Sequence, residues 1–461
     1  MKLEEIMTIE TINPATNQVI ASYQQLTDKE AAENLIRAEK AFLKWKRTSI
    51  SERRILMNKA ADVLQENKEK YAKVITMEMG KTLKSSIAEV EKCALVCRYY
   101  ADNTEKFLED EFIETDASKS YVTYRPLGVV LAVMPWNFPF WQVFRFAAPA
   151  LMAGNAGVLK HASNVPHCGE LIQEVFEEAG FPKNLFINVC ISGNQVEKLI
   201  ENPMIKAVTL TGSEKAGSAV ASKAAEHIKK AVLELGGSDA YLILEDADLN
   251  LAAKLCAESR LLNSGQSCIG AKRFIVLEEE YDEFLSLFIK EMASARMGDP
   301  SHKDTTLAPM ARTDLRDELH KQVEESVSKG AEIALGGEIP EIEGAYYPAT
   351  ILVNVKPGMP AYEDELFGPV ATVIKVKNEE QAILVANDSK FGLGSGVFTS
   401  DLERGERIAK YELEAGSSFV NQYVKSDPRL PFGGIKTSGF GRELSHHGIK
   451  EFMNAKTVYI A

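Results

Sequence analysis

The stretch Asn263-Ser264-Gly265-Gln266-Ser267-Cys268 places one cysteine directly after a polar turn that contains glycine. Ile269-Gly270-Ala271 follows, and Arg273–Leu277 then has the apolar, β-branched composition of a strand. A cysteine on such a turn is within reach of a substrate, and nearby backbone N–H groups would lower the pKa of its thiol. Because the thiolate is the nucleophilic form, covalent catalysis at Cys268 is one interpretation. The alternative is a small apolar residue that fills a loop.

The bulk properties of the chain exclude several classes of protein. Its 461 residues are too many for one simple core, so two large domains are expected. The net charge of −13 disfavours nucleic acid or an anionic membrane as a partner. No apolar run approaches the ~20 residues that span a bilayer, and the first residues lack the apolar region of a signal peptide. Six cysteines are too few for a disulfide framework and form no zinc set, so we expect a cytoplasmic protein without a metal.

The order of secondary structure predicts the fold class. After a strand-turn-strand segment over residues 8–25 and about a hundred mainly helical residues, apolar strands alternate with helices. This alternation predicts an α/β fold with a parallel sheet covered on both faces, which binds ligands at the carboxyl ends of its strands. The expected strands are Val129–Met134, Ala156–Lys160, Leu185–Cys190, Ala207–Leu210 and Ala231–Leu235, followed after Gly236-Gly237 by a second series with Tyr241–Leu244, Phe274–Leu277 and Ala371–Lys375.

Two further segments carry structural expectations. Gly392-Leu393-Gly394-Ser395-Gly396 resembles a nucleotide-binding loop, but no clear strand precedes it, so we interpret it as a turn. Thr457-Val458-Tyr459-Ile460 is β-prone and has no obvious local partner. A terminal strand of that kind often pairs with another subunit, which suggests an oligomer.

Polar residues follow several of the predicted strands. Asn137 comes where a strand ends and a helix begins, so its amide either caps that helix or points at a reacting oxygen. Lys160 ends the next strand and either holds a ribose or phosphate or is simply solvated. Thr211-Gly212-Ser213 opens a helix, and helix N-termini bind phosphate well.

Two carboxylates stand in unusual surroundings. Glu234 ends an apolar strand, where desolvation would raise its pKa and make it a general base near neutral pH, unless it is an ordinary paired carboxylate. Glu365 lies in Glu365-Leu366-Phe367-Gly368-Pro369, next to an aromatic ring and a tight turn. Its carboxylate would suit a ribose diol, and the ring of Phe367 would pack against a nicotinamide.

These stretches, in this order, resemble the aldehyde dehydrogenase superfamily over essentially the whole chain. The motifs that carry the resemblance are Pro135-Trp136-Asn137-Phe138-Pro139, Thr211-Gly212-Ser213, Leu233-Glu234-Leu235-Gly236-Gly237, Gly265-Gln266-Ser267-Cys268, Glu365–Pro369 and Pro431-Phe432-Gly433-Gly434-Ile435-Lys436-Thr437-Ser438-Gly439. The resemblance implies two doubly wound open-sheet domains and a small β oligomerisation domain. It places the NAD(P)-binding domain at residues 1–116 and 131–236, the catalytic domain at 237–432, and the bridging segments at 117–130 and 433–461.

The resemblance also assigns roles to single residues. Cys268 would attack an aldehyde to give a thiohemiacetal, and the amide of Asn137 with the Cys268 backbone N–H would form the oxyanion hole. Hydride loss would leave a thioester, which water activated by Glu234 would hydrolyse to the acid. NADP or NAD would contact Pro135, Trp136, Lys160, Ser163, Gly212, Ser213, Leu235, Glu365 and Phe367.

Ser163 bears on the choice of cofactor. Members of the superfamily that prefer NAD often carry a glutamate at this position, three residues after the lysine, where it accepts from the ribose 2′-hydroxyl. A carboxylate there would repel a 2′-phosphate, whereas serine together with Lys160 would hold one. We therefore expect NADP to be accepted.

The substrate is inferred from one helix face. Trp141 and Arg145 are four residues apart, so Arg145 would grip a substrate carboxylate while Trp141 packs against its carbon chain. The alternative for Arg145 is a structural salt bridge. These residues, with Lys160–Asn164 and Gly439–Ser445, look like the bacterial succinate-semialdehyde dehydrogenase branch, and Ser426 would be a second carboxylate contact. A neutral or aromatic aldehyde, or a non-catalytic structural protein with this fold, are the rival hypotheses. The resemblance implies a homodimer or homotetramer.

Overall fold

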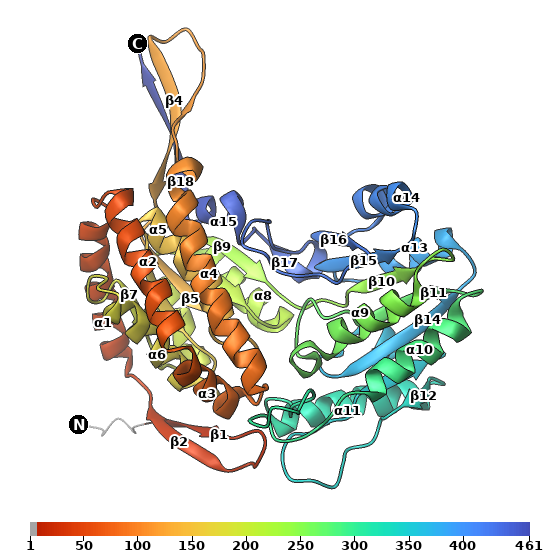
Figure 1. The fold of residues 1–461 in the computed structure, drawn as a ribbon. Coiled ribbons are helices and arrows are strands. Elements are labelled where there is room, and N and C mark those ends of the chain that lie inside the picture. Colours follow the sequence, from red (N-terminus) through yellow and green to blue (C-terminus); the bar gives the residue numbers. More distant parts are fainter. Residues whose placement is uncertain (1–6) are drawn as a thin grey trace.

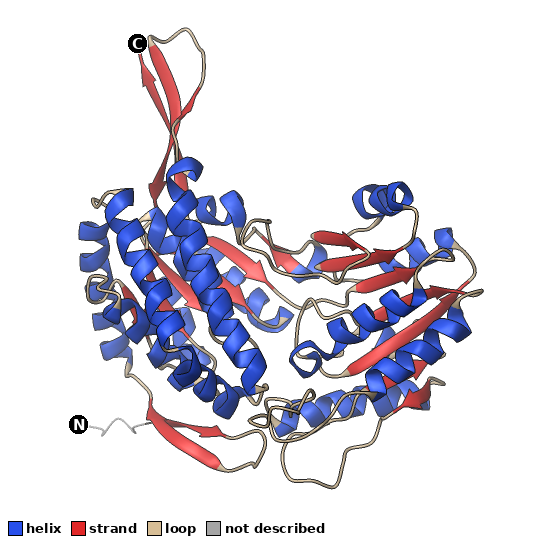
Figure 2. Cartoon of the chain, viewed as in Figure 1, coloured by secondary structure: helices blue, strands red, loops and turns tan. Residues whose placement is uncertain are grey.

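The computed structural model describes residues 7–461, which form two lobes side by side, with an arm that projects from one of them (Figure 1). Helices and strands alternate in both lobes, and each lobe contains its own sheet (Figure 2). This arrangement confirms the predicted α/β class with two open-sheet domains.

The first lobe is built on a six-stranded sheet in the order β17-β9-β8-β5-β6-β7. Neighbouring strands from β9 to β7 are parallel, and the short β17 joins the edge in the antiparallel direction. The near-continuous apolar sequences of these strands fit burial on both faces. The strands are β5 (Val129–Val133), β6 (Ala156–Lys160), β7 (Phe186–Asn188), β8 (Ile205–Thr211), β9 (Lys230–Glu234) and β17 (Gly439–Phe440).

Helices surround this sheet and form the N-terminal part of the lobe. They are α1 (Asp28–Trp45), α2 (Ile50–Glu66), α3 (Lys68–Met79), α4 (Leu83–Phe107), α5 (Trp141–Ala153), α6 (Pro166–Glu178), α7 (Gly193–Glu201), α8 (Glu214–Glu226) and, from the C-terminal part of the chain, α15 (Ser445–Glu451). Every side chain of α5 is buried, and α4 packs against α2, α3 and α5. The long helix α4 therefore lies directly beside the helix that follows Asn137.

The second lobe contains a seven-stranded sheet in the order β12-β13-β14-β11-β10-β15-β16. All neighbouring strands in this sheet are parallel except the edge strand β12, which pairs with β13 in the antiparallel direction. Its strands are β10 (Ala240–Ile243), β11 (Arg273–Leu277), β12 (Glu332–Leu335), β13 (Thr350–Val353), β14 (Val370–Val376), β15 (Gly394–Phe398) and β16 (Ser417–Val420). Its helices are α9 (Leu249–Leu261), α10 (Tyr281–Ala293), α11 (Thr313–Ser328), α12 (Pro360–Glu363), α13 (Glu379–Asn387) and α14 (Leu402–Arg407).

The prediction of a turn at residues 392–396 is wrong, because β15 begins at Gly394 and lies inside the sheet. Its first residues have little β-propensity, which hid the strand from sequence reasoning. The small residues have a packing reason, since a Cβ atom on Gly396 would lie only 3.0 Å from the ring of Tyr241. The buried Tyr241 ring thus occupies the space beside this strand.

The arm is a three-stranded antiparallel sheet in which the C-terminal strand lies at the edge. β18 (Met453–Ile460) pairs along its length with β4 (Lys119–Pro126), and β3 (Glu111–Phe112) completes the sheet. The C-terminal strand therefore pairs with a distant segment of its own chain, and because it lies at the edge of the sheet its pairing with another subunit stays a prediction. A separate hairpin, β1 (Thr8–Ile12) with β2 (Val19–Gln24), reaches the second lobe through the hydrogen bond from Ala345 N–H to Pro14 O, at 2.8 Å.

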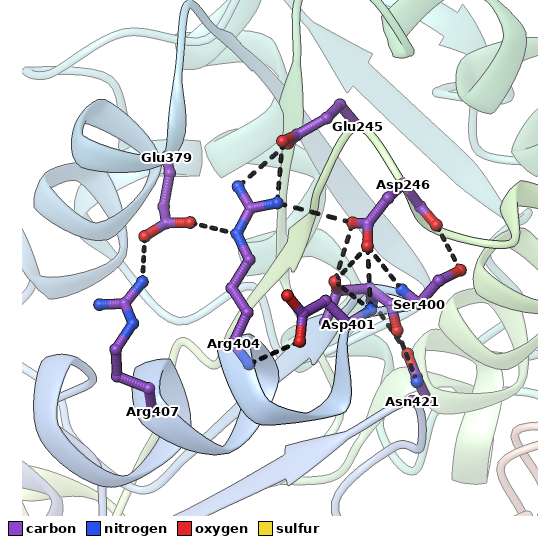
Figure 3. A network of polar contacts seen from close by, with 9 residues as sticks. Glu245, Asp246, Glu379, Ser400, Asp401, Arg404, Arg407 and Asn421 are labelled. Atoms are coloured by element: carbon purple, nitrogen blue, oxygen red, sulfur yellow. Dashed lines mark hydrogen bonds and ion pairs between the residues drawn. The ribbon is translucent and has the colours of Figure 1, made fainter.

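A network of charged and polar residues lies at the carboxyl edge of the second sheet (Figure 3). Arg404 pairs with Glu245 at 2.8 Å and with Glu379 at 2.5 Å, and Asp246 accepts from the Ser400 N–H at 3.0 Å. Since Glu245 follows β10 whereas Cys268 precedes β11, the network and the cysteine lie at opposite edges of this sheet. The second lobe thus presents the amino ends of its strands to the site, and the first lobe presents carboxyl ends.

Candidate active site

Two loops meet between the lobes, one after β5 and one before β11. The Asn137 side-chain amide donates to the backbone carbonyl of Gln266 at 3.1 Å, and the Asn263 amide donates to the carbonyl of Asn137 at 2.8 Å. The structure therefore brings Asn137 to the loop that carries Cys268. The alternative that Asn137 caps the next helix is wrong, because α5 begins at Trp141 with Phe140 at the cap position.

The loop before Cys268 has a strained backbone. Asn263, Ser264 and Gly265 adopt φ angles of 56°, 54° and 75°, in the left-handed region that non-glycine residues rarely occupy. The buried side chains of Asn263 and Ser264 hold this conformation through hydrogen bonds. Asn263 bonds the carbonyls of Asn137 and Gln266, and the Ser264 hydroxyl donates to Ala308 O at 2.8 Å. Such strain persists only where the surroundings over-determine it, and here it sets the direction of the chain into Cys268.

Cys268 is half-buried as a residue, and the pKa of its thiol differs from the prediction. Burial raises the pKa of the Cys268 thiol to about 12, while Lys272 and Arg145 act in the opposite direction. The expected lowering by backbone N–H groups is therefore wrong in this state. The ammonium of Lys272 is directed at backbone carbonyls, with 2.7 Å to Cys268 O and 2.9 Å to Ser267 O, which places it next to the cysteine loop.

Glu234 ends β9 with its carboxyl group buried and without a partner. Neither carboxyl oxygen accepts a hydrogen bond within residues 7–461. Burial raises the pKa of Glu234 well above its usual range, the negative charge of Glu443 raises it further, and Arg145 opposes both. A carboxyl group in these surroundings keeps its proton to a higher pH than an ordinary glutamate does.

Arg145 is engaged in an ion pair. Its guanidinium meets the carboxylate of Glu443, both side chains are buried, and the ring of Phe432 lies 4.4 Å from the guanidinium carbon. Burial raises the pKa of Glu443, whereas the guanidinium of Arg145 acts in the opposite direction. This is the arrangement that the sequence left open as a structural salt bridge.

Trp141 and Ser426 are in contact, and a third residue joins them. The Trp141 indole N–H donates to the Ser426 hydroxyl oxygen at 3.0 Å, and the Lys92 ammonium donates to the same oxygen at 2.8 Å. Lys92 also lies 4.1 Å from the centre of the Trp141 ring. Sequence reasoning missed Lys92. Its only signal is a lysine next to buried positions of α4 such as Glu89, Cys93 and Val96.

The residues expected to hold a cofactor lie mainly at the carboxyl edge of the first sheet. Ser213 caps α8, where its hydroxyl accepts from Ala216 N–H at 3.3 Å. A Cβ atom on Gly212 would meet only Leu210, at 3.6 Å, so the space over this helix N-terminus is open. Backbone N–H groups that face open space at a helix N-terminus fit a pyrophosphate. Leu235 packs closely on Gly217, where a Cβ atom would come within 2.6 Å of it.

The remaining cofactor candidates come from both lobes. Lys160 ends β6 and burial lowers its pKa, while Ser163 is exposed in the loop that follows. Pro135 precedes Trp136, whose indole meets the ring of Phe367 edge to face, with 5.8 Å between ring centroids. Glu365 pairs with Lys272 at 3.1 Å and accepts from Gly237 N–H at 3.1 Å, so its carboxylate is fixed near the junction of the lobes. The lysine, hydroxyl, carboxylate and aromatic side chains among these residues are of the kinds that suit the phosphate, ribose and nicotinamide groups of a dinucleotide.

Comparison with known proteins assigns the chain to a family. The model named "Aldehyde dehydrogenase family" matches residues 2–458. The chain belongs to the aldehyde dehydrogenase family. Members of this family are oxidoreductases that act on small aldehydes.

Three relatives of the family are similar over their whole length. "Probable succinate-semialdehyde dehydrogenase [NADP(+)]" of Synechocystis sp. is 50% identical, with 99% of this chain and 100% of that protein covered. "Succinate-semialdehyde dehydrogenase [NADP(+)] 1" of Mycobacterium tuberculosis is 46% identical, with 99% and 100% covered. The crystal structure of succinic semialdehyde dehydrogenase from Streptococcus pyogenes with NADP+ has a TM-score of 0.96 and 41% identity, with 98% and 99% covered.

The described residues, 7–461, contain neither a candidate membrane-spanning helix nor a candidate metal site. No helix there is both long and apolar enough to cross a membrane. No cluster of three or more histidine, cysteine, aspartate or glutamate side chains in that range is arranged to hold a metal ion.

Proposed function

We propose that this protein oxidises succinate semialdehyde to succinate with NADP+, and also accepts NAD+. The observation that carries the proposal is the meeting of the Cys268 loop with Asn137, in a site where Glu234 is buried and unpaired. The names of its relatives support the substrate and the cofactor. An aldehyde dehydrogenase for a neutral or aromatic aldehyde is the alternative.

In this proposal Cys268 is the nucleophile. The thiol gives its proton to water, the sulfur forms a bond to the aldehyde carbon, and the electron pair of the C=O bond moves to the oxygen, which carries the negative charge of the resulting thiohemiacetal. One amide hydrogen of Asn137 is used by the Gln266 carbonyl, so the other is available with the Cys268 backbone N–H to stabilise that oxygen. A bound NADP+ or NAD+ supplies the acceptor for the hydride that leaves the carbon. As the hydride leaves, the C=O bond forms again, and the acyl group remains bound to the Cys268 sulfur as a thioester.

Glu234 acts in the second half of the reaction. Its carboxylate takes a proton from a water molecule, the water oxygen attacks the thioester carbon, and the C–S bond breaks to release the acid and the Cys268 thiolate. The raised pKa of Glu234 makes it a stronger base than an ordinary carboxylate once it is ionised. Hydrolysis rather than transfer to another thiol follows from the presence of this base.

The residues proposed to hold the cofactor are those of the first-sheet edge and the lobe junction. Ser163 with Lys160 would hold the 2′-phosphate that distinguishes NADP+ from NAD+, because Ser163 is exposed and brings no negative charge to the loop. The open helix N-terminus at Gly212 and Ser213 would hold the pyrophosphate. Glu365 and Phe367 would hold the nicotinamide end, together with Trp136 and Leu235.

The assembly and the location of the protein are also proposals. The edge position of β18 in the arm supports a homodimer or homotetramer, since a free strand edge is a ready surface for a second chain. The sparse cysteines support a cytoplasmic location, and the net charge of −13 disfavours nucleic-acid and membrane partners. We propose the predicted domain divisions with one change. Within the predicted bridging segment 433–461, β17 pairs with β9 and α15 packs against α5, so both belong with the first lobe.

Initial rates with succinate semialdehyde and with butanal, each with NADP+ and NAD+, test the proposal. We expect kcat/KM to be higher for succinate semialdehyde, and activity with NADP+. Equal or better activity with butanal would refute the proposed substrate and favour the alternative. Absence of activity with both aldehydes and both cofactors would refute the proposed function.

A further inference from the structure

One buried ammonium group, that of Lys272, contacts both the cysteine loop and a residue proposed to hold the cofactor. It donates to the backbone carbonyls of Ser267 at 2.9 Å and Cys268 at 2.7 Å, and it lies 3.1 Å from a carboxylate oxygen of Glu365. The Lys272 side chain is only 1% exposed. An ammonium carries three hydrogens, so these three acceptors account for all of its donor capacity. Lys272 therefore has no hydrogen left for a substrate, and any part it has in the reaction is through these neighbours.

The bond to the Ser267 carbonyl fixes the direction of the Cys268 backbone N–H. The two groups belong to the same peptide unit, and no peptide bond within residues 7–461 is cis. In a planar trans peptide the C=O and N–H bonds point in opposite directions. The Ser267 carbonyl is held by Lys272 and also accepts from Gly270 N–H at 3.1 Å. The Cys268 N–H consequently points away from Lys272, and it donates to no acceptor within residues 7–461, as an oxyanion donor requires.

The bond to the Cys268 carbonyl anchors the other side of the nucleophile. Gly237 packs against this carbonyl, since a Cβ atom on Gly237 would come within 2.8 Å of the oxygen. The N–H of Gly237 in turn donates to Glu365 at 3.1 Å. Gly237 lies between β9 and β10, on the connection that passes from the first sheet to the second. Its backbone therefore contacts both of the groups that Lys272 holds at this junction.

The pair with Glu365 connects the same ammonium to the proposed cofactor site. Lys272 and the Gly237 N–H both contact the Oε1 atom of Glu365. The Oε2 atom accepts no hydrogen bond from any group within residues 7–461. Lys272 thus fixes one oxygen of the carboxylate and leaves the other to accept from a hydroxyl group, such as that of a ribose.

Lys272 also acts on the thiol through its charge. Burial raises the pKa of the Cys268 thiol to about 12. Among the charged groups that face the thiol, Lys272 and Arg145 lower this pKa, whereas Glu365 and Asp239 raise it. Of the two cations, Lys272 has the larger effect. It therefore favours the thiolate, the nucleophilic form, in addition to orienting the backbone around it.

We infer that Lys272 is a positioning residue that directs the Cys268 N–H into the oxyanion site and holds the Glu365 carboxylate for the cofactor. This inference rests on the proposed function, in which Cys268 is the nucleophile and Glu365 contacts the cofactor. It adds a single residue that sets the geometry of both. Lys272 itself touches neither the aldehyde nor the cofactor in this account.

Arg53 shows the alternative, a buried cation that only stabilises the fold. Its guanidinium lies in the first lobe and donates to three backbone carbonyls, those of Trp45, Thr48 and Met152. None of these acceptors belongs to the cysteine loop or to the proposed cofactor site. Arg53→Met is therefore the matched control, because it removes a buried cation and its bonds to carbonyls away from the site.

The test compares Lys272→Met with Arg53→Met in kcat and in cofactor binding. Loss of a directed oxyanion donor predicts that Lys272→Met lowers kcat about 100-fold, for succinate semialdehyde and butanal alike. The Kd of NADP+, measured without aldehyde by quenching of tryptophan fluorescence, is expected to rise about tenfold. The Kd of NAD+ should rise by the same factor, because Glu365 is proposed to contact the nicotinamide end that both cofactors share. Arg53→Met should lose stability but keep kcat and both Kd values near those of the wild type.

The outcomes separate this inference from the proposed function. If Lys272→Met is folded and loses no more kcat than Arg53→Met does, Lys272 does not position the oxyanion site. An unchanged Kd for both cofactors would overturn its role toward Glu365. Should Lys272→Met not fold, Lys272→Gln takes its place with changes expected in the same directions, since its neutral amide fills most of the same space. A wild type that is inactive with both aldehydes would refute the proposed function, while the Kd values would still decide whether Lys272 holds Glu365.

Discussion

Arg145 and Glu443 form an ion pair in which both side chains are almost completely buried. Removing one member of such a pair leaves the other as an uncompensated charge in a medium of low dielectric constant. We expect Arg145→Gln to lower the free energy of unfolding by about 3 kcal/mol. Urea unfolding of the purified variant measures this.

The double variant Arg145→Gln/Glu443→Gln serves as the matched comparison. Because it removes both charges, we expect it to recover much of the stability that the single variant loses. If Arg145→Gln unfolds at the same urea concentration as the wild type, the ion pair does not have the structural role assigned to it.

The side chain of Asn263 connects the nucleophile loop to Asn137 and supports the left-handed turn. We expect Asn263→Ala to lower kcat at least about tenfold, because a small error in the position of a catalytic group is costly. Asn263→Gly relieves the backbone strain but still lacks the amide, so it is expected to recover stability without recovering kcat.

Asn354 offers a control of the same backbone type. It also has a positive φ, of 56°, but its side chain is exposed. Asn354→Ala should cost about 1 kcal/mol of stability through the backbone alone and leave kcat unchanged. A kcat for Asn263→Ala equal to that of Asn354→Ala would show that the amide of Asn263 does not position the site.

Sequence patterns predicted the parallel sheet of the first lobe because its strands are continuous apolar runs with strong β-propensity. They failed at β15, where glycine and serine form a buried strand beside Tyr241. They also missed the partner of the C-terminal strand, because β4 lies more than three hundred residues earlier in the chain. Strand pairing at that separation depends on tertiary contacts and leaves no local signal.

The site shows the same division between local and non-local information. Motifs identified Asn137, Glu234 and Cys268 as candidates, and the structure brings Asn137 to the cysteine loop. The shift in the pKa of the Cys268 thiol was mispredicted because it depends on burial of the thiol by segments distant in sequence. Lys92 was missed for a related reason, because the hydroxyl of Ser426 to which it donates lies 334 positions away in sequence.

Ser163 is predicted to set the preference for the cofactor. Ser163→Glu places a negative charge where the 2′-phosphate would bind, so we expect KM for NADP+ to rise about tenfold, with a smaller change for NAD+. Ser163→Gln is the neutral control of nearly the same size. Equal effects of the two substitutions on NADP+ would show that side-chain size, rather than charge, determines the change.

Glu234 is predicted to control the pH dependence of turnover. Burial, reinforced by the charge of Glu443, raises its pKa, so the base is protonated at low pH and becomes available as the pH rises. We expect kcat to increase with pH through an ionisation above the ordinary glutamate value of about 4.3. In Glu234→Gln, turnover should be slow and this rise should disappear.

The first half of the reaction provides the control for that variant. Formation of the thioester does not require Glu234 in this account, so Glu234→Gln should still give a burst of one reduced cofactor per active site. A wild-type profile that rises through a pKa in the ordinary carboxyl range, or a variant that retains the rise, would assign the pH dependence to another group.

The most direct test is the intact mass of Glu234→Gln after mixing with succinate semialdehyde and NADP+. The account predicts one succinyl group per chain, mapped by peptide analysis to the segment that contains Cys268, and no such adduct in Cys268→Ser/Glu234→Gln. Two results would contradict the proposal that Cys268 carries the reaction. One is a succinyl group on another residue of Glu234→Gln, and the other is full turnover by the single variant Cys268→Ser.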